Sequence, residues 1–214
     1  MQMIDQPISI SSWDRVANDA LLIKTVSALE KNGFTVSVVK NREEAKEKAL
    51  SLIPEGAEVM TMTSLTLQQA GIDSAINESG KYDALHPKLI KMDREVMEKE
   101  IKKFRSVPDF AIGSVHAITA DGKIFIASGT GSQLPAYVYG AKKVIWVVGI
   151  QKLVKDMDAG FKRLYEYVLP LESERINKVY NITSGSSVNR LLIYNKEMNK
   201  DRIHIILVKE NLGF

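Results

Sequence analysis

Two short segments of this chain gather the side chains best suited to holding a negatively charged molecule. The first, Thr-Ser-Leu-Thr at residues 63–66, offers the hydroxyls of Thr63, Ser64 and Thr66. The second, Ser-Gly-Thr-Gly-Ser at residues 128–132, has almost no side-chain bulk. Loops of this composition expose hydroxyls and backbone N–H groups, which are hydrogen-bond donors that suit an anion. We therefore predict that both segments bind a small anionic ligand.

The second segment combines two kinds of residue with two different uses. Gly129 and Gly131 are expected to let backbone amides approach the ligand, because glycine places no side chain in the way. Ser128, Thr130 and Ser132 are expected to donate hydroxyl hydrogen bonds. Phosphate, carboxylate, or the phosphates of a nucleotide or of coenzyme A all fit such a loop.

Acid–base chemistry has two candidates in the sequence. Asp121 can pair with a ligand hydroxyl or act as a general base, and His116 is the second candidate. A lone histidine, however, is more often structural than catalytic. Glu78 and Glu172 are both expected to face solvent.

Metal and redox chemistry are not predicted for this chain. It has no cysteine, which excludes disulfides, thiolate nucleophiles and cysteine-held metal clusters. Its three histidines, His86, His116 and His204, are far apart and show no metal-binding spacing. We expect no metal and no cofactor, and we expect His86 to be a loop or surface histidine.

The charge and hydropathy of the chain argue against nucleic acid and membranes as partners. The net charge is only +3, and its 29 basic and 26 acidic residues are spread along the chain. No apolar stretch approaches the ~18 residues that a membrane span needs, and the N-terminus lacks the pattern of a signal peptide. We therefore expect a cytoplasmic protein.

Alternating strands and helices must position the two hydroxyl segments. Hydrophobic patterns predict strands at residues 34–39, 57–62, 110–112, 117–119, 123–127, 143–149, 191–194 and 202–208. Helices are predicted at residues 14–31, 42–52, 65–70, 73–79, 94–104, 133–139, 155–168 and 171–179. Ser11 or Ser12 can cap the first helix, and Thr63 or Ser64 can cap the third. Such a cap, worth about 1 kcal/mol, is the structural alternative to ligand binding.

Turn and breaker residues set several of the predicted boundaries. Asp121-Gly122 indicates a hairpin between the strands on either side. Pro170 is expected to break the helix that precedes it. Residues 82–87 are expected to be extended, because the residue before Pro87 avoids the helical region. Residues 150–154 are expected to form a tight loop.

The alternation of elements favours an α/β fold with a mostly parallel sheet and flanking helices. The strand at 202–208 is apolar on both faces apart from His204, so we expect it inside the sheet. In open α/β sheets, ligands bind outside the carboxyl ends of the strands. Because each hydroxyl segment follows a strand, we expect the two to converge over one cleft. Lys142 and Lys143 are expected to add positive potential there.

Five motifs, in a fixed order, carry a resemblance to a known family. They are Thr-Ser-Leu-Thr-Leu (63–67), Ala-Ile-Thr-Ala-Asp-Gly-Lys (117–123), Ser-Gly-Thr-Gly-Ser (128–132), Tyr-Gly-Ala-Lys-Lys-Val-Ile (139–145) and the C-terminal segment 202–214. The ordered set resembles the LUD domain, the lactate-utilisation family that includes lactate utilisation protein C. The resemblance implies a fold similar to the sugar-phosphate isomerase/deaminase and CoA-transferase group. It also implies a bacterial gene associated with oxidation of lactate or related organic acids.

The extent of the resemblance sets the predicted domain organisation. It covers nearly the whole chain, so we expect an N-terminal arm at residues 1–13 and a single LUD-like domain at residues 14–214. Two departures from the family pattern stand out. The cysteine cluster of similar short family members is absent from residues 180–189, and Met62 or Thr63 replaces a small glycine, which narrows the first loop.

Three classes of function remain open on the sequence alone. The resemblance favours an accessory subunit that binds an anionic small molecule and works with iron–sulfur or flavin oxidoreductase partner proteins. An enzyme acting on a phosphorylated sugar, CoA ester or folate-like substrate is the alternative by fold analogy, although no glutamate lies where CoA-transferases carry their nucleophile. A metabolite-binding regulatory protein is the third. An exposed Tyr137/Tyr139 helix face is expected to suit a homodimer contact.

Overall fold

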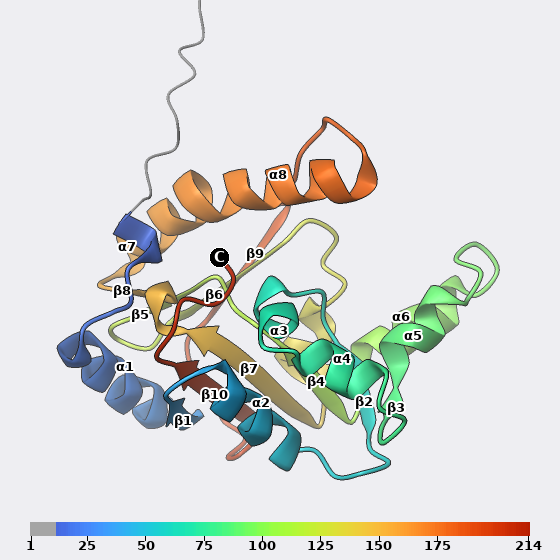
Figure 1. Ribbon diagram of the computed structural model, residues 1–214, viewed down its shortest axis with the longest axis horizontal. Coiled ribbons are helices and arrows are strands. Elements are labelled where there is room, and N and C mark those ends of the chain that lie inside the picture. Colours follow the sequence, from blue (N-terminus) through green and yellow to red (C-terminus); the bar gives the residue numbers. More distant parts are fainter. Residues whose placement is uncertain (1–11) are drawn as a thin grey trace, which may run out of the picture.

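The computed structural model describes residues 12–214, and a six-stranded sheet lies at its centre (Figure 1). Its neighbouring strands all run parallel, in the order β1-β10-β7-β4-β2-β3. The strands are β1 (Thr35–Val39), β2 (Glu58–Thr61), β3 (Asp83–Ala84), β4 (Phe110–Gly113), β7 (Lys143–Gly149) and β10 (Ile203–Val208). The predicted α/β fold with a mostly parallel sheet is confirmed. Most of the predicted arm, residues 1–11, lies outside the described residues.

The two longest strands, β7 and β10, are the apolar centre of this sheet. β10 lies between β1 and β7, with Ile205 beside Trp146, so its predicted internal position is confirmed. Alternate residues of each strand point to opposite faces, and both faces are covered. Near-continuous apolar runs such as Val144–Val148 are typical of parallel strands buried on both sides.

A second, four-stranded sheet packs beside the first, and the sequence analysis did not predict it as a separate sheet. Its order is β8-β5-β6-β9, from β5 (Ala117–Thr119), β6 (Ile124–Ser128), β8 (Leu153–Val154) and β9 (Arg190–Tyr194). The predicted hairpin of β5 and β6 is present and antiparallel. The predicted loop at 150–154 is instead a 3-10 turn, η3 (Ile150–Lys152), followed by β8, which pairs parallel with β5.

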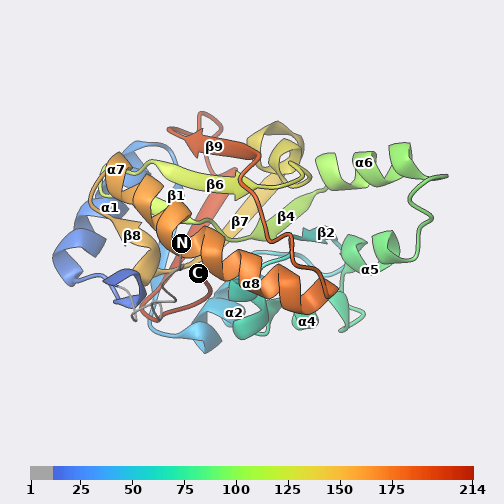
Figure 2. The same cartoon turned by 90° about the horizontal axis from the view of Figure 1, so that it is seen from above.

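Both faces of the central sheet are covered, one by helices alone and the other by helices together with the second sheet (Figures 1 and 2). One face packs on α2 (Arg42–Ser51), α3 (Leu65–Gln69) and α4 (Ile72–Asn77). The other packs on α1 (Asp19–Lys31), α5 (Leu85–Ile90), the π-helical turn η2 (Ala136–Gly140) and the second sheet. Helices α5 and α6 (Glu98–Ser106) project to one side, at the right of Figure 1.

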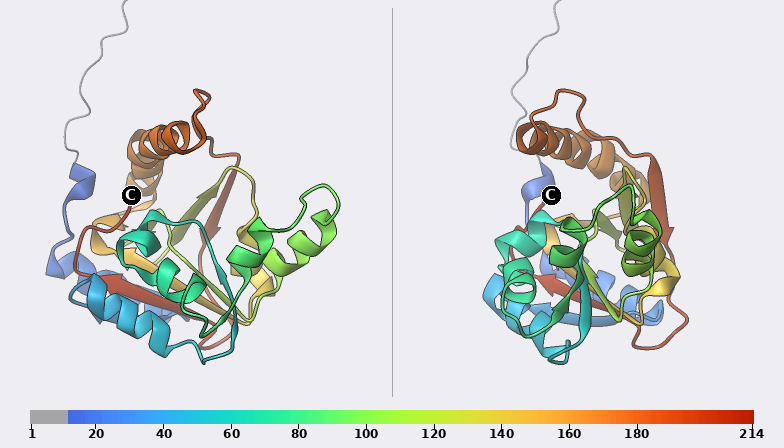
Figure 3. Two further views of the ribbon diagram at one scale, coloured as in Figure 1. Left: turned by 45° about the vertical axis from the view of Figure 1, so that its right-hand side comes forward. Right: turned by 90° about the vertical axis from the view of Figure 1, so that its right-hand side faces the viewer.

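A continuous helical stretch crosses above the second sheet (Figure 3). It consists of α7 (Met157–Lys162), the π-helical turn η4 (Arg163–Val168) and α8 (Leu169–Tyr180). The prediction that Pro170 breaks this helix is wrong. The proline lies in the first turn of α8, directly after the π-helical turn, where the backbone hydrogen-bonding pattern already departs from the regular α-helix.

Three other predicted boundaries change in the structure. Asn18 caps α1, and Ser12 lies in the separate 3-10 turn η1 (Ser12–Asp14), so the helix is not capped by Ser12; Ser11 lies outside the described residues. Pro87 lies in the first turn of α5, where a missing N–H costs little, so residues 85–87 are helical rather than extended. Helix α6 begins at Glu98, four residues later than predicted.

Within residues 12–214, no helix has the length and apolarity that a membrane span requires.

Candidate functional site

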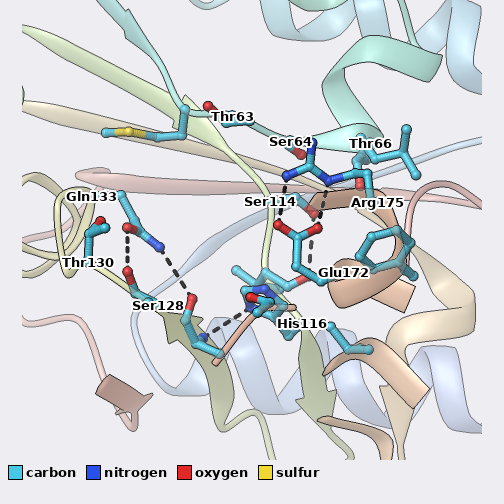
Figure 4. A pocket seen from close by; sticks show the side chains of 18 of the residues that line it. Thr63, Ser64, Thr66, Ser114, His116, Ser128, Thr130, Gln133, Glu172 and Arg175 are labelled. Atoms are coloured by element: carbon cyan, nitrogen blue, oxygen red, sulfur yellow. Dashed lines mark hydrogen bonds and ion pairs between the residues drawn. The ribbon is translucent and has the colours of Figure 1, made fainter. Parts of the chain in front are cut away.

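A cavity of about 340 Å³ opens where the two sheets and the long helix meet (Figure 4). Residues 63–66, after β2, and Ser114, after β4, form one wall at the carboxyl ends of the parallel strands. The loop after β6 forms a second wall. Helix α8 forms the third through Leu169, Glu172 and residues one turn further on. The cavity therefore lies where open α/β sheets bind ligands.

Most of the predicted ligand-binding residues come together around this cavity, although they derive from segments far apart in the sequence. The residues that line it are Thr63, Ser64, Thr66, His116, Ser128, Gly129, Thr130 and Ser132. Two predicted residues, Asp121 and Gly131, are not among those that line it. The predicted convergence of the two hydroxyl segments on one cleft therefore agrees with the geometry.

Asp121 lies in the β5–β6 turn, and its contacts there are structural. Its carboxylate forms an ion pair with Lys123 and accepts a hydrogen bond from the Thr119 hydroxyl at 2.5 Å. These two contacts hold the pKa of this mostly exposed carboxyl below its usual value. The turn rests on the end of α1, where the Asn32 amide donates to the Asp121 carbonyl at 3.0 Å. The structure thus places this candidate general base in a hairpin turn and not in the cavity.

Gly131 shapes the loop and does not present its amide to the cavity. Its φ of +80° is a left-handed conformation that favours glycine, and a Cβ there would come within 2.6 Å of the Arg190 side chain. Its N–H donates to the Ser128 hydroxyl at 2.7 Å, so this amide is already satisfied. Ser128 in turn donates to Gln133 at 2.9 Å. The Gly129 carbonyl accepts from Arg190 at 2.9 Å.

The hydroxyls of the first segment have different environments. Ser64 occupies the N-cap position of α3, yet its side chain makes no capping hydrogen bond, so the structural alternative does not explain it. Thr63 is exposed and Thr66 is buried. The Thr66 hydroxyl donates to the Leu212 carbonyl at 3.2 Å and accepts from Lys152 Nζ at 3.0 Å.

Lys152 is the cavity residue that the sequence analysis missed. Its side chain is only 2% exposed. Nζ lies 3.0 Å from Thr66 Oγ1, 3.1 Å from Ser114 Oγ and 3.2 Å from the Val115 carbonyl. All three neighbours are uncharged. The sequence offers one signal, since Lys152 lies between apolar residues in the segment 150–154. Because this segment was predicted to be a loop, Lys152 was not expected to be buried.

The surroundings of Lys152 disfavour its charged form. Burial is the main reason that its pKa lies well below the usual value, and the nearby Arg163 guanidinium lowers it further. Arg163 is itself fully buried, donates to the His116 carbonyl at 2.5 Å and lies over the Tyr167 ring. Among residues 12–214, neither cation forms an ion pair with a carboxylate. A group whose pKa is shifted this way inside a cavity is a candidate functional residue.

Two histidines line the cavity and use their Nδ1 atoms in opposite ways. His116 Nδ1 accepts from the Ala127 N–H at 3.1 Å, so its proton is on Nε2. Burial, with the charges of Lys152 and Arg163, lowers its pKa to about 3, which keeps the ring neutral. His86 Nδ1 donates to the Thr61 carbonyl at 3.1 Å. His86 lies on α5 and lines the cavity, so its assignment as a loop or surface histidine is wrong.

Arg105, from α6, is the second cation without a carboxylate partner among the described residues that line the cavity. It donates to Ser132 Oγ at 3.4 Å. On the opposite side, Glu172 and Arg175 of α8 pair through two hydrogen bonds of 2.7 Å and cancel each other's charge (Figure 4). Glu172 lines the cavity, so its predicted position in solvent is wrong. Glu78 is exposed as predicted.

The structure also places the two lysines and the two tyrosines that the sequence singled out, and the histidines and carboxylates that could bind a metal. Lys143 begins β7, and its Nζ donates to the Asp201 carbonyl at 2.6 Å. Neither it nor Lys142 lines the cavity, because they lie at the opposite end of the strand. Tyr137 is 1% exposed and cannot form a dimer surface, whereas Tyr139 is 87% exposed. Over residues 12–214, no three histidine or carboxylate side chains group as metal ligands.

The parallel sheet with a polar cavity beyond its strand ends defines an open α/β protein. The comparison with known families adds the more specific assignment. The model of the LUD domain matches residues 22–208, and the chain belongs to this family. No curated protein matches it.

One solved structure shares the fold, and two others show weaker similarity. A DUF162-family protein from Deinococcus radiodurans is 10% identical, with a TM-score of 0.56 over 91% of this chain and 99% of that one. A ribose-5-phosphate isomerase solved with phospho-erythronic acid is 14% identical, with a TM-score of 0.38 over 71% and 76%. The eIF2B beta subunit of Chaetomium thermophilum is 13% identical, with a TM-score of 0.37 over 55% and 44%.

Proposed function

We propose that this LUD-domain protein binds a small organic anion in the cavity and acts as an accessory subunit in the utilisation of lactate or a related organic acid. Family membership supports the association with organic acids. The site chemistry supports the anion. The residues that would hold it are the hydroxyls of Thr63, Ser64 and Ser132, together with Arg105 and Lys152.

One observation carries the proposal: each hydroxyl segment is hydrogen-bonded to a basic side chain that lacks a carboxylate partner within residues 12–214. Lys152 contacts Thr66 of the first segment, and Arg105 contacts Ser132 of the second. Elsewhere the protein neutralises a buried cation, since Arg202 pairs with Glu197 at 2.8 Å. An anion in the cavity would supply the missing negative charge.

The size of the cavity narrows the class of ligand. About 340 Å³ is close to the lower end of the ~300–1,000 Å³ common for ligand pockets. This favours a carboxylate or phosphate ester of a few carbons over a nucleotide or coenzyme A. Apolar walls from Val115, Leu164 and Val168 suit a short carbon skeleton next to the charged group.

Calorimetric titration tests the proposal with lactate, pyruvate and inorganic phosphate, and with neutral lactamide as the uncharged comparison. We expect binding of at least one anion and none of lactamide. Arg105→Gln should weaken that binding by about 10- to 100-fold, because a hydrogen bond to a charged group contributes ~1.5–3 kcal/mol.

The matched control is Arg94→Gln, which removes the same charge from an exposed arginine whose field reaches Arg105 but which does not line the cavity. It should leave affinity almost unchanged. Equal losses of affinity in both variants would assign the effect to the general electrostatic field and count against direct contact between Arg105 and the anion.

The accessory role is tested separately, by co-purification with an iron–sulfur or flavin oxidoreductase encoded beside this gene.

A further inference from the structure

We propose that Lys152 is a catalytic nucleophile that forms a Schiff base with a carbonyl-bearing organic anion, a 2-oxo acid, bound in the cavity. The inference rests on the proposed function, because the anion site must hold the carboxylate while the amine reacts. It also goes beyond binding, since it assigns a covalent reaction to the chain.

The environment of the Lys152 amine favours this role. Lys152 Nζ is buried against two hydroxyls and one backbone carbonyl, all uncharged, and it lines the cavity. A lysine that served only to stabilise the fold would be expected to meet a carboxylate, as Arg202 meets Glu197. Burying an ammonium among neutral groups is unfavourable, and this favours the neutral amine, which is the nucleophilic form.

A neighbouring positive charge also favours the neutral amine of Lys152. The Arg163 guanidinium lowers the pKa of Lys152 further, after burial. A desolvated lysine beside another cation is a known way for proteins to produce an amine nucleophile near neutral pH. Exposed lysines of this chain, such as Lys155, have no such surroundings.

The cavity also holds groups that suit the proton transfers of condensation. The amine lone pair attacks the carbonyl carbon, and a C–N bond forms as the carbonyl π bond breaks. The nitrogen loses one proton and the oxygen takes one up, which gives a neutral carbinolamine. The carbinolamine then loses its hydroxyl group and the remaining nitrogen-bound proton as water, and a C=N bond forms. No oxidant or reductant is needed. His116 presents an Nε2–H that can donate to the carbonyl oxygen, and the imidazole of His86 also lines the cavity.

The two cations divide the roles that a 2-oxo acid requires. Arg105 is always charged and has a hydroxyl partner in Ser132, so it suits the carboxylate. Lys152 is deeper and uncharged in its reactive form, so it suits the adjacent carbonyl. The paired Glu172 and Arg175 lie on the α8 wall and add no net charge.

Reductive trapping tests the inference on the full-length protein. The protein is incubated with pyruvate or 2-oxoglutarate and cyanoborohydride near neutral pH, and adducts are located by intact mass and peptide mapping. We expect one saturable adduct on Lys152, because burial favours its neutral amine, which is the form that attacks a carbonyl. Excess lactate, which has no ketone, should suppress it.

The controls separate this inference from the proposed function. Lys152→Met should lose the adduct, whereas Lys155→Met, three residues on and exposed, should keep it. The wild-type peptide map needs no variant, so a folding defect cannot decide the result. Pyruvate that binds in calorimetry without any adduct on Lys152 would overturn the inference and leave the proposed function intact. If pyruvate neither binds in calorimetry nor forms an adduct, both the inference and the proposed function are overturned. Adducts spread equally over surface lysines, without binding in calorimetry, would also overturn both.

Discussion

At the scale of single residues, Lys152 is where stability and function are most directly opposed. Its amine is buried without a carboxylate partner among residues 12–214, and this costs folding free energy. Methionine has a similar length and no charge. We therefore predict that Lys152→Met leaves the free energy of unfolding unchanged or raises it by up to about 2 kcal/mol, measured by urea denaturation at pH 7.

The difference in free energy of unfolding between wild type and Lys152→Met should change with pH in one direction. The pKa of Lys152 is lowered on folding, so between its folded value and about 10.4 the unfolded chain binds the proton more strongly. Wild-type stability should therefore rise relative to the variant as pH increases through this window. Lys155→Met provides the matched control without such a trend. A variant that is less stable than wild type at pH 7, with no change in the difference at higher pH, would contradict this account.

At the scale of elements, the turn of the β5–β6 hairpin contributes to stability but does not line the cavity. Gly122 has a φ of +80°, and a Cβ there would lie 2.7 Å from the Asn32 amide nitrogen and 3.1 Å from backbone atoms of α1. We predict that Gly122→Ala destabilises the protein by about 2–3 kcal/mol in urea denaturation, from strain and from the displaced helix.

The neighbouring Asp121→Asn variant is the comparison for this hairpin. It removes a mostly exposed ion pair, so stability should change by less than about 1 kcal/mol. Anion affinity should not change, because Asp121 does not line the cavity. A large loss of affinity in Asp121→Asn would restore the sequence-based assignment of this residue.

The elements also show what local sequence determines. The strands β7 and β10 were predictable because each is a long apolar run, and the β5–β6 hairpin because Asp-Gly sits between two such runs. Strand β8 is two residues long and gains its identity from pairing with β5, more than thirty residues away. The helix through Pro170 continues because a π-helical turn precedes the proline, which no local pattern indicated.

At the scale of the whole molecule, acid should weaken the fold through partly buried histidines. Burial, with the charge of Lys48, lowers the pKa of His204 to about 4, and His116 is lowered to about 3. Below about pH 6.5 the unfolded chain takes up protons that the folded chain does not, so stability falls as pH decreases toward 4.

His204→Gln tests this dependence away from the cavity. His204 lies on β10 and contacts the Ser37 hydroxyl at 2.8 Å, which glutamine can also reach. The variant should lose less stability than wild type between pH 7 and pH 4, by about 2 kcal/mol. Identical acid sensitivity in the two proteins, measured by urea denaturation at each pH, would show that His204 does not contribute.

The cavity is a property of the whole molecule, and this limited its prediction. The hydroxyl segments were visible because composition marks them locally and the rule for strand ends brings them together. Lys152, His86, Arg105 and Glu172 could not be assigned, because each looks like an ordinary loop or surface residue until the fold assembles the walls. Their role follows from burial and missing charge partners, which only the three-dimensional arrangement defines.

The most direct test of the central claim is a crystal structure of the protein with oxamate, an anionic pyruvate analogue whose amide carbonyl does not condense with an amine. The account predicts density in the cavity between residues 63–66 and 128–132, with the carboxylate hydrogen-bonded to Arg105 and the carbonyl directed toward Lys152. An empty cavity at a concentration that saturates the protein in calorimetry, or oxamate bound elsewhere on the molecule, would contradict it.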